Sequence, residues 1–111
     1  MQYLLLIYDN EKRWSDGYSD AEMVEYRAYG KEFAGAIRGG NALLPTSTAK
    51  TVRVRANKAS VTDGPFAETK EQLAGFYLME AASMEEALVM AEKLPGAKYG
   101  SIEVRPIMTF Q

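Results

Sequence analysis

The stretch Tyr3-Leu4-Leu5-Leu6-Ile7-Tyr8 is apolar at every position. Side chains alternate between the two faces of a strand, so this pattern is typical of a strand that is buried on both faces. The stretch from Gly75 to Met79 is apolar in the same way and predicts a second such strand. Together they indicate a sheet with apolar side chains on both of its faces.

Two helices are predicted to pack against this sheet. Each begins with a capping box, in which a Ser hydroxyl and a Glu carboxylate three residues later bind free backbone N–H groups. The boxes are Ser19-Asp20-Ala21-Glu22 and Ser83-Met84-Glu85-Glu86. The first helix is expected to end at Gly39-Gly40, with an apolar stripe of Met23, Tyr26, Gly30, Phe33 and Ile37. The second is expected to end at Pro95-Gly96, with a stripe of Met84, Ala87, Leu88 and Ala91.

The middle of the chain predicts a β-hairpin. Residues Thr51–Arg55 alternate with a period of two, Ala56-Asn57-Lys58 forms a turn, and Ala59–Thr62 returns as the second strand. Short strands are also expected at Ala42–Leu44 and Ile102–Ile107. The order is therefore β-α-β, an inserted hairpin, then β-α-β, which is an α+β arrangement.

This arrangement leaves one apolar sheet face without a cover. Two helices can cover only one face, and a large apolar patch in water is unfavourable. We expect the other face to pack against a second copy in a symmetric homodimer. In the alternative interpretation, the inserted hairpin folds back over that face, which Arg53 and Arg55 on its strand disfavour.

Composition excludes several classes of function. The 111 residues, expected to form a single domain (1–111), carry a net charge of −2, which provides no positive field for direct nucleic-acid binding. The chain has no Cys and no His, so it lacks a disulfide framework, the commonest general base and the commonest nitrogen ligand of zinc. No phosphate loop or dinucleotide fingerprint occurs, and we expect neither a metal site nor a cofactor. The apolar runs are far shorter than the ~20 residues that span a bilayer, so we expect a cytoplasmic protein that does not associate with a membrane.

The densest motif is Asp63-Gly64-Pro65-Phe66-Ala67-Glu68-Thr69-Lys70-Glu71. Asp63 can bond downstream backbone amides, Gly64 tolerates any backbone geometry, and Pro65 restricts the residue before it, so the three predict a turn. Phe66 is expected to pin this loop against the core and to hold Asp63 in place. Asp63 is then a candidate general acid or base, although it could be only the residue that forms the turn.

Four further residues are candidates for ligand binding. Lys70 and Arg105 could hold an anionic group, whereas Glu68 lies within the motif and Tyr8 lies at the end of the first strand. Three of them have a structural alternative as well. Glu68 could be a solvated surface charge, Arg105 could pair with Glu103 on the sheet surface, and Tyr8 could belong to the core or to a dimer interface.

Several of these segments together resemble the YCII-related family, in its DGPF-domain branch. They are Tyr3–Tyr8, Thr51–Val54, Thr62–Glu71 followed by Gly75-Phe76-Tyr77, and Ile102–Ile107. The resemblance covers nearly the whole chain and implies a ferredoxin-like fold and a dimeric α/β barrel. A His–Asp pair has been inferred as the active site of some members, and DGPF proteins are associated with extracytoplasmic-function sigma factors. Asp63 is the candidate for that Asp, but this chain has no His to complete the pair.

Three hypotheses about function follow. The first is a ligand-binding or regulatory homodimer that holds a small polar or anionic molecule near the motif through Lys70, Arg105 and backbone amides. The second is an enzyme of the lyase or isomerase type with Asp63 as general acid or base. The third is an accessory partner of a sigma factor. We favour the first, because the motif lacks a complete catalytic set.

Overall fold

The structure, a computed structural model, describes residues 1–110. It contains an antiparallel four-stranded sheet in the order β2-β5-β1-β6, a separate ribbon of β3 and β4, and two longer helices. The strands are β1 (Gln2–Asp9), β2 (Ile37–Ala42), β3 (Lys50–Arg55), β4 (Lys58–Asp63), β5 (Gln72–Glu80) and β6 (Ser101–Pro106). The helices are α1 (Glu11–Trp14), α2 (Asp20–Glu32), α3 (Met84–Glu92) and the 3₁₀ turns η1 (Thr46–Thr48) and η2 (Pro95–Lys98). This is the predicted ferredoxin-like fold with an inserted hairpin.

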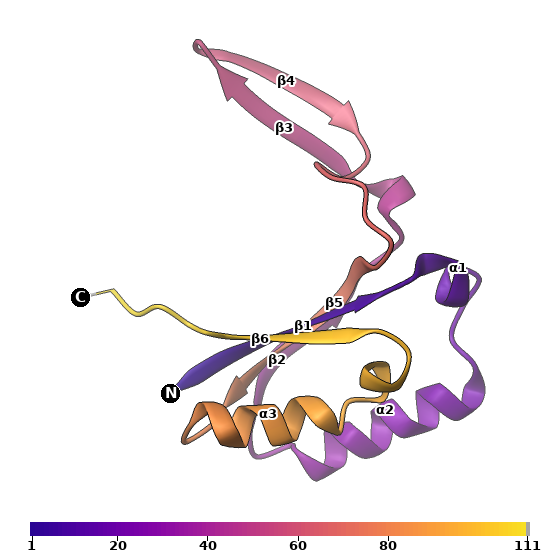
Figure 1. Cartoon of the computed structure of the whole chain (residues 1–111), viewed down its shortest axis with the longest axis vertical. Helices are drawn as coiled ribbons and strands as arrows, with labels where there is room; N and C mark the ends of the chain where they lie inside the picture. The colour runs from indigo at the N-terminus through magenta and orange to yellow at the C-terminus, as the bar shows by residue number, and fades with distance from the viewer. Residues whose placement is uncertain (111) are drawn as a thin grey trace.

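The hydrophobic core lies between the sheet and the helices α2 and α3, which cover the same face (Figure 1). On β1, Tyr3, Leu5 and Ile7 are buried in this core together with Met79 of β5. The helices contribute Tyr29 from α2, and Ala87, Met90 and Ala91 from α3. Burial of this apolar area is the main favourable term in folding.

The other side of the sheet has no helix over it. Burial alternates along β1, and Leu4 and Leu6 are only half-buried in the single chain. They pair with Leu78 and Phe76 of β5, which share their side of the sheet. We call this surface of Leu4, Leu6, Phe76 and Leu78 the open face. The prediction that β1 is apolar on both faces is confirmed, but only one of these faces is fully buried within one chain.

The boundary between the first long helix and the second strand differs from the prediction. Helix α2 ends at Glu32, Ile37 already belongs to β2, and Gly39-Gly40 lies inside that strand, so the predicted strand at Ala42–Leu44 begins too late. The reason is the close approach of β2 to β5. A Cβ on Gly40 would lie 2.7 Å from the carbonyl oxygen of Phe76. Gly40 is therefore required by strand pairing and does not terminate the helix.

Both helix starts occur where the capping boxes predict them. Ser19 accepts a hydrogen bond from the Glu22 backbone N–H at 3.1 Å, and Ser83 accepts one from that of Glu86 at 3.2 Å. The Glu side chains differ from the predicted pattern. Glu22 binds Arg13, and Glu86 accepts from the Ala82 backbone N–H, one residue before the cap.

The predicted hairpin is confirmed as the β3–β4 ribbon, and we call residues 50–63 the arm. Its turn residues Ala56 and Asn57 have φ values of 50° and 63°, as a tight two-residue hairpin turn requires. The arm does not fold back over the open face but stands clear of the body (Figure 1), contrary to the alternative interpretation. The radius of gyration of 15.8 Å accordingly exceeds the roughly 13 Å expected for a compact chain of this length. No helix within residues 1–110 is long and apolar enough to cross a membrane.

Candidate functional site

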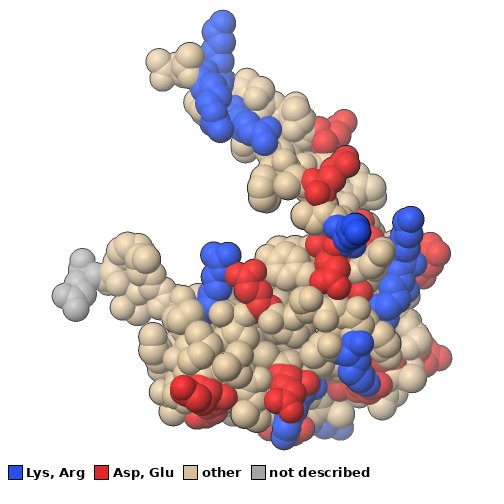
Figure 2. All heavy atoms as spheres, in the orientation of Figure 1, with Lys and Arg blue, Asp and Glu red and all other residues tan. Residues whose placement is uncertain are grey.

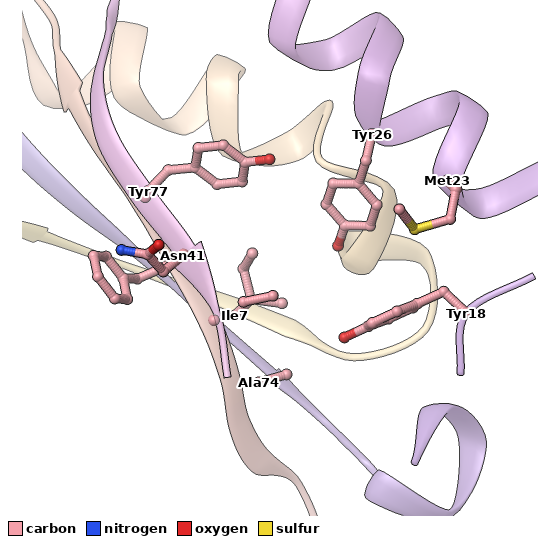
Figure 3. Close-up of a pocket in the computed structure, with 11 residues that line it drawn as sticks. Ile7, Tyr18, Met23, Tyr26, Asn41, Ala74 and Tyr77 are labelled. Carbon is pink, nitrogen blue, oxygen red and sulfur yellow. The ribbon is translucent and has the colours of Figure 1, made fainter. Parts of the chain in front are cut away.

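A pocket of about 310 Å³ lies between α2 and the edge of the sheet formed by β2 and β5. We call it the tyrosine pocket (Figure 3). Its lining includes Ile7 of β1, Tyr18 before α2, Met23 and Tyr26 of α2, and residues 74–77 of β5. Strand β2 contributes residues 40–42. Figure 3 shows the three tyrosine rings around the space above Ile7. Among residues 1–110, no charged side chain lines the pocket.

The hydroxyls of Tyr18, Tyr26 and Tyr77 are polar groups at this pocket, whose lining also includes Asn41. Burial raises the pKa of Tyr26 and of Tyr77 above the ordinary value of 10. Burial, reinforced by the nearby carboxylate of Glu22, also raises the pKa of Tyr18. All three hydroxyls are therefore neutral at physiological pH and able both to donate and to accept a hydrogen bond. They can orient a ligand, but a neutral phenol is a poor general base.

A charge cluster of Asp9, Arg13 and Glu22 lies near Tyr18 of the pocket wall. Asp9 and Glu22 are 3% and 4% exposed, and both bind the guanidinium of Arg13. The Arg13 Nε–Asp9 Oδ2 distance is 2.8 Å, and the Nη1–Glu22 Oε1 distance is 2.9 Å. The guanidinium also lies 4.1 Å from the ring centroid of Tyr99, a cation–π contact. The two carboxylates raise the pKa of Arg13, so its charge is permanent.

This cluster determines where Tyr18 lies. Arg13 belongs to α1, Asp9 to the end of β1 and Glu22 to the first turn of α2, so their ion pairs tie three elements together. The loop between α1 and α2 carries Tyr18, whose ring stacks on the buried Trp14 at 5.6 Å between centroids and 2° between planes. The pocket wall is thus built on a rigid support.

The DGPF-type motif forms a separate site at the base of the arm. A groove of about 540 Å³ brings Tyr8 together with Pro65 and Phe66, and its lining also includes Leu43, Leu44, Lys50, Thr69 and Gln72. Gly64 has a φ of 92°, which favours glycine. Its N–H donates to Ala49 O at 2.7 Å, and its carbonyl accepts from the Thr51 hydroxyl at 2.8 Å. The motif is therefore a firm corner made by backbone hydrogen bonds.

The predicted role of Phe66 as a buried anchor is wrong for the single chain. Its side chain is 80% exposed, because the motif turns away from the core toward the arm. Asp63 is not held beside a pocket either. Its carboxylate is 86% exposed and pairs with Lys50 Nζ at 2.6 Å, across the ribbon, and not with Lys70.

The other candidate residues do not converge on one site. Glu68 and Lys70 are exposed and line neither the tyrosine pocket nor the groove. Arg105 is hydrogen-bonded to Glu103 on β6, which matches the surface-pair alternative, and this bond raises its pKa. Of the four candidates for ligand binding, only Tyr8 lines the groove.

The sequence interpretation missed the tyrosine pocket, although one local signal pointed to part of it. Tyr18 immediately precedes the cap residue Ser19, and Met23 is the fourth residue of the helix. An apolar pair at these positions is the hydrophobic staple, which predicts that the two side chains meet. Both line the pocket. The contribution of Tyr77 depends on the pairing of distant strands, which no local pattern reveals.

The fold and the site define this chain as a ferredoxin-like α+β protein with an aromatic pocket between its sheet and its first long helix. The family model of the YCII-related domain matches residues 1–111, so the chain belongs to the YCII-related family. It is 41% identical over 118 aligned residues to the uncharacterized protein R00369 of Rhizobium meliloti (strain 1021), covering 100% of this chain and 95% of that protein.

A solved structure is also similar. It is 5-chloro-2-hydroxyhydroquinone dehydrochlorinase (TftG) from Burkholderia phenoliruptrix AC1100 in complex with 2,5-dihydroxybenzoquinone. The TM-score is 0.51 at 18% sequence identity, and the match covers 97% of this chain and 94% of that one. At this level of identity the likeness supports the fold and does not transfer an activity.

Replacing Arg13 with Gln is expected to destabilise the fold. The change leaves Asp9 and Glu22 buried without a cation. Breaking a fully buried pair costs about 3–5 kcal/mol, and we expect about 2–4 kcal/mol here because the Arg13 side chain is 30% exposed. Urea unfolding measures this loss. The matched control is Arg27→Gln on the exposed side of α2, which should change stability by less than about 0.5 kcal/mol.

Stability should also fall at alkaline pH. Burial raises the pKa of Tyr26, Tyr29 and Tyr77 in the folded state above the unfolded value of about 10. The folded state therefore holds these protons more tightly, so the stabilisation is complete below about pH 10 and is lost as the pH rises further toward the folded values. Tyrosinate absorbance should show some tyrosines ionising only well above pH 10. A single step near pH 10 for all seven would contradict this.

Proposed function

We propose that this protein is a homodimer that binds a small, uncharged aromatic molecule in the tyrosine pocket. The observation that carries the proposal is an apolar pocket around which the hydroxyl-bearing rings of Tyr18, Tyr26 and Tyr77 are arranged (Figure 3). Ligand pockets commonly have this composition, with mainly apolar walls and a few polar groups that set orientation.

The walls of the pocket restrict the chemistry of the ligand. A charged ligand would lose its hydration without gaining an ion pair, because no Lys, Arg, Asp or Glu lines the pocket. Flat rings suit a planar partner, since aromatic pairs prefer stacked or edge-to-face contacts. The hydroxyls favour oxygen substituents such as carbonyl or hydroxyl groups. A volume of about 310 Å³ is at the lower end for ligand pockets and indicates a small molecule of one or two rings.

The proposed binding site lies away from the motif at residues 63–71. Lys70 and Glu68 are exposed, and Arg105 is engaged by Glu103. Catalysis by Asp63 as general acid or base near neutral pH would need a desolvated carboxyl group, whereas its side chain is 86% exposed. We therefore favour ligand binding over an enzymatic role.

The homodimer is supported by the open face. Leu4, Leu6, Phe76 and Leu78 form a contiguous apolar surface across β1 and β5, and each is only half-buried. Surfaces of this kind mark interaction sites in soluble proteins. Packing two such faces together would bury these side chains in a symmetric, self-complementary interface.

Ligand binding can be measured with the fluorescence of Trp14, the single tryptophan of the chain. Because Trp14 stacks on Tyr18, a ligand in the tyrosine pocket should change its emission. We expect hydroxylated aromatics or quinones to bind and their aliphatic analogues to bind at least tenfold more weakly. Ala42→Phe, at the exposed rim of the pocket, should abolish binding by filling the space. Ala28→Phe on the exposed side of α2 is the matched control and should bind normally. Equal binding by both variants would refute the site.

The dimer can be tested by sedimentation at micromolar concentration. Wild-type protein should sediment as a dimer, and Leu6→Glu should sediment as a monomer because it places a charge on the open face. Leu88→Glu, at a side chain of α3 that is 51% exposed, is the control and should leave the dimer intact. A wild-type monomer would contradict this part of the proposal.

A further inference from the structure

We propose that the arm of each copy extends over the body of the second copy and packs there through its apolar strip. We define this strip as Val52, Val54, Ala59 and Val61. The inference rests on the homodimer of the proposed function and adds an interface that the open face does not contain.

The strip lies on one side of the ribbon. Val52 pairs with Val61 across the two strands and Val54 pairs with Ala59, so the four side chains share a face. The three valines are between 61% and 64% exposed. An isolated two-stranded hairpin is at best marginally stable in water. The strip therefore lacks the contact that would make the arm stable, and the described part of the chain does not supply it.

Charge identifies a second copy as the fitting partner. Residues 50–63 hold four Lys or Arg and one Asp, a net charge of +3, which leaves nine Lys or Arg against fourteen Asp or Glu elsewhere, a net charge of −5. Figure 2 shows the basic side chains at the far end of the arm. Arg53, Arg55 and Lys58 project from the side of the ribbon opposite the strip, because they belong to the pairs Arg53–Ser60 and Arg55–Lys58. They attract the acidic body of a second copy at long range, while the strip makes the packed contact. Nucleic acid fits less well, because the acidic body would repel it and the apolar strip would have no partner.

The base of the arm holds it in an extended position. Ala49 and Thr51 are hydrogen-bonded to Gly64, and Glu11 accepts bonds from the backbone N–H and the hydroxyl of Thr46 at 2.6 and 2.9 Å. Figure 1 shows α2 and α3 on one side of the sheet and the arm rising on the other. That is the side of the open face, so a second copy packed there comes within reach of the arm. A rigid base reduces the entropy that such a contact costs.

The test replaces the strip while keeping the ribbon. Val52→Thr/Val61→Thr retains shape and strand propensity but puts four hydroxyls per dimer into the proposed interface. We expect the dimer dissociation constant, measured by sedimentation equilibrium, to rise about a hundredfold or more. The control Ser60→Thr/Thr62→Ser makes two substitutions on the other side of the same ribbon. It should change the dimer dissociation constant less than threefold. Trp14 fluorescence should report unchanged ligand binding in both variants, which separates this test from that of the pocket.

Cross-linking identifies the copy that is contacted. The chain has no Cys, so Val54→Cys places a single photoreactive label on the strip. In a mixture of isotopically heavy and light protein, we expect cross-links that join a heavy arm to a light body. A wild-type monomer would overturn both the homodimer and the arm contact. Three results would overturn the arm contact alone. The first is an unchanged dimer affinity in Val52→Thr/Val61→Thr, and the second is cross-links only within one copy. The third is salt-dependent binding of a DNA duplex that Arg53→Gln/Arg55→Gln removes.

Discussion

The rest of the structure depends on one constraint: the sheet has two apolar faces, but its two long helices cover only one of them. Helices α2 and α3 cover the face of Leu5 and Ile7, and Leu4 and Leu6 remain on the other. The molecule is correspondingly flat, with extents of 46 × 43 × 19 Å. The extended arm and the exposed Phe66 and Phe110 add apolar surface outside the core. In the proposed homodimer, the open face of a second copy would cover Leu4 and Leu6.

A second constraint is electrostatic and determines the shape of the tyrosine pocket. Asp9 and Glu22 are buried carboxylates from different elements, and they are compatible with the core only because Arg13 binds both. The same ion pairs bring the end of β1, α1 and the start of α2 together. The pocket wall at Tyr18 follows from this junction. Glu22 is an example: its carboxylate binds the guanidinium of Arg13 instead of the backbone N–H that the capping box predicts.

The sequence predicted those features that depend on local chemistry. The capping serines, the hairpin turn and the strands β1 and β5 all occur where the residue patterns indicate. It misjudged Gly40, because a helix stop and a close strand contact both favour glycine. It also misjudged Phe66, since an aromatic residue in a turn does not reveal whether its own chain covers it. The tyrosine pocket joins α2 to β5, and only tertiary structure brings these segments together.

Strand β5 links the two proposed surfaces. Tyr77 points into the tyrosine pocket, whereas its neighbours Phe76 and Leu78 point to the open face, because successive side chains of a strand alternate. A ligand that orders Tyr77 therefore acts on a residue bonded directly to two residues of the proposed dimer interface. Since thermodynamic coupling is reciprocal, any effect of the ligand on dimer affinity must appear as an equal effect of dimerisation on ligand affinity. The proposed ligand site and the proposed dimer interface thus lie on opposite faces of one strand, close enough to influence each other and distinct enough to be altered separately.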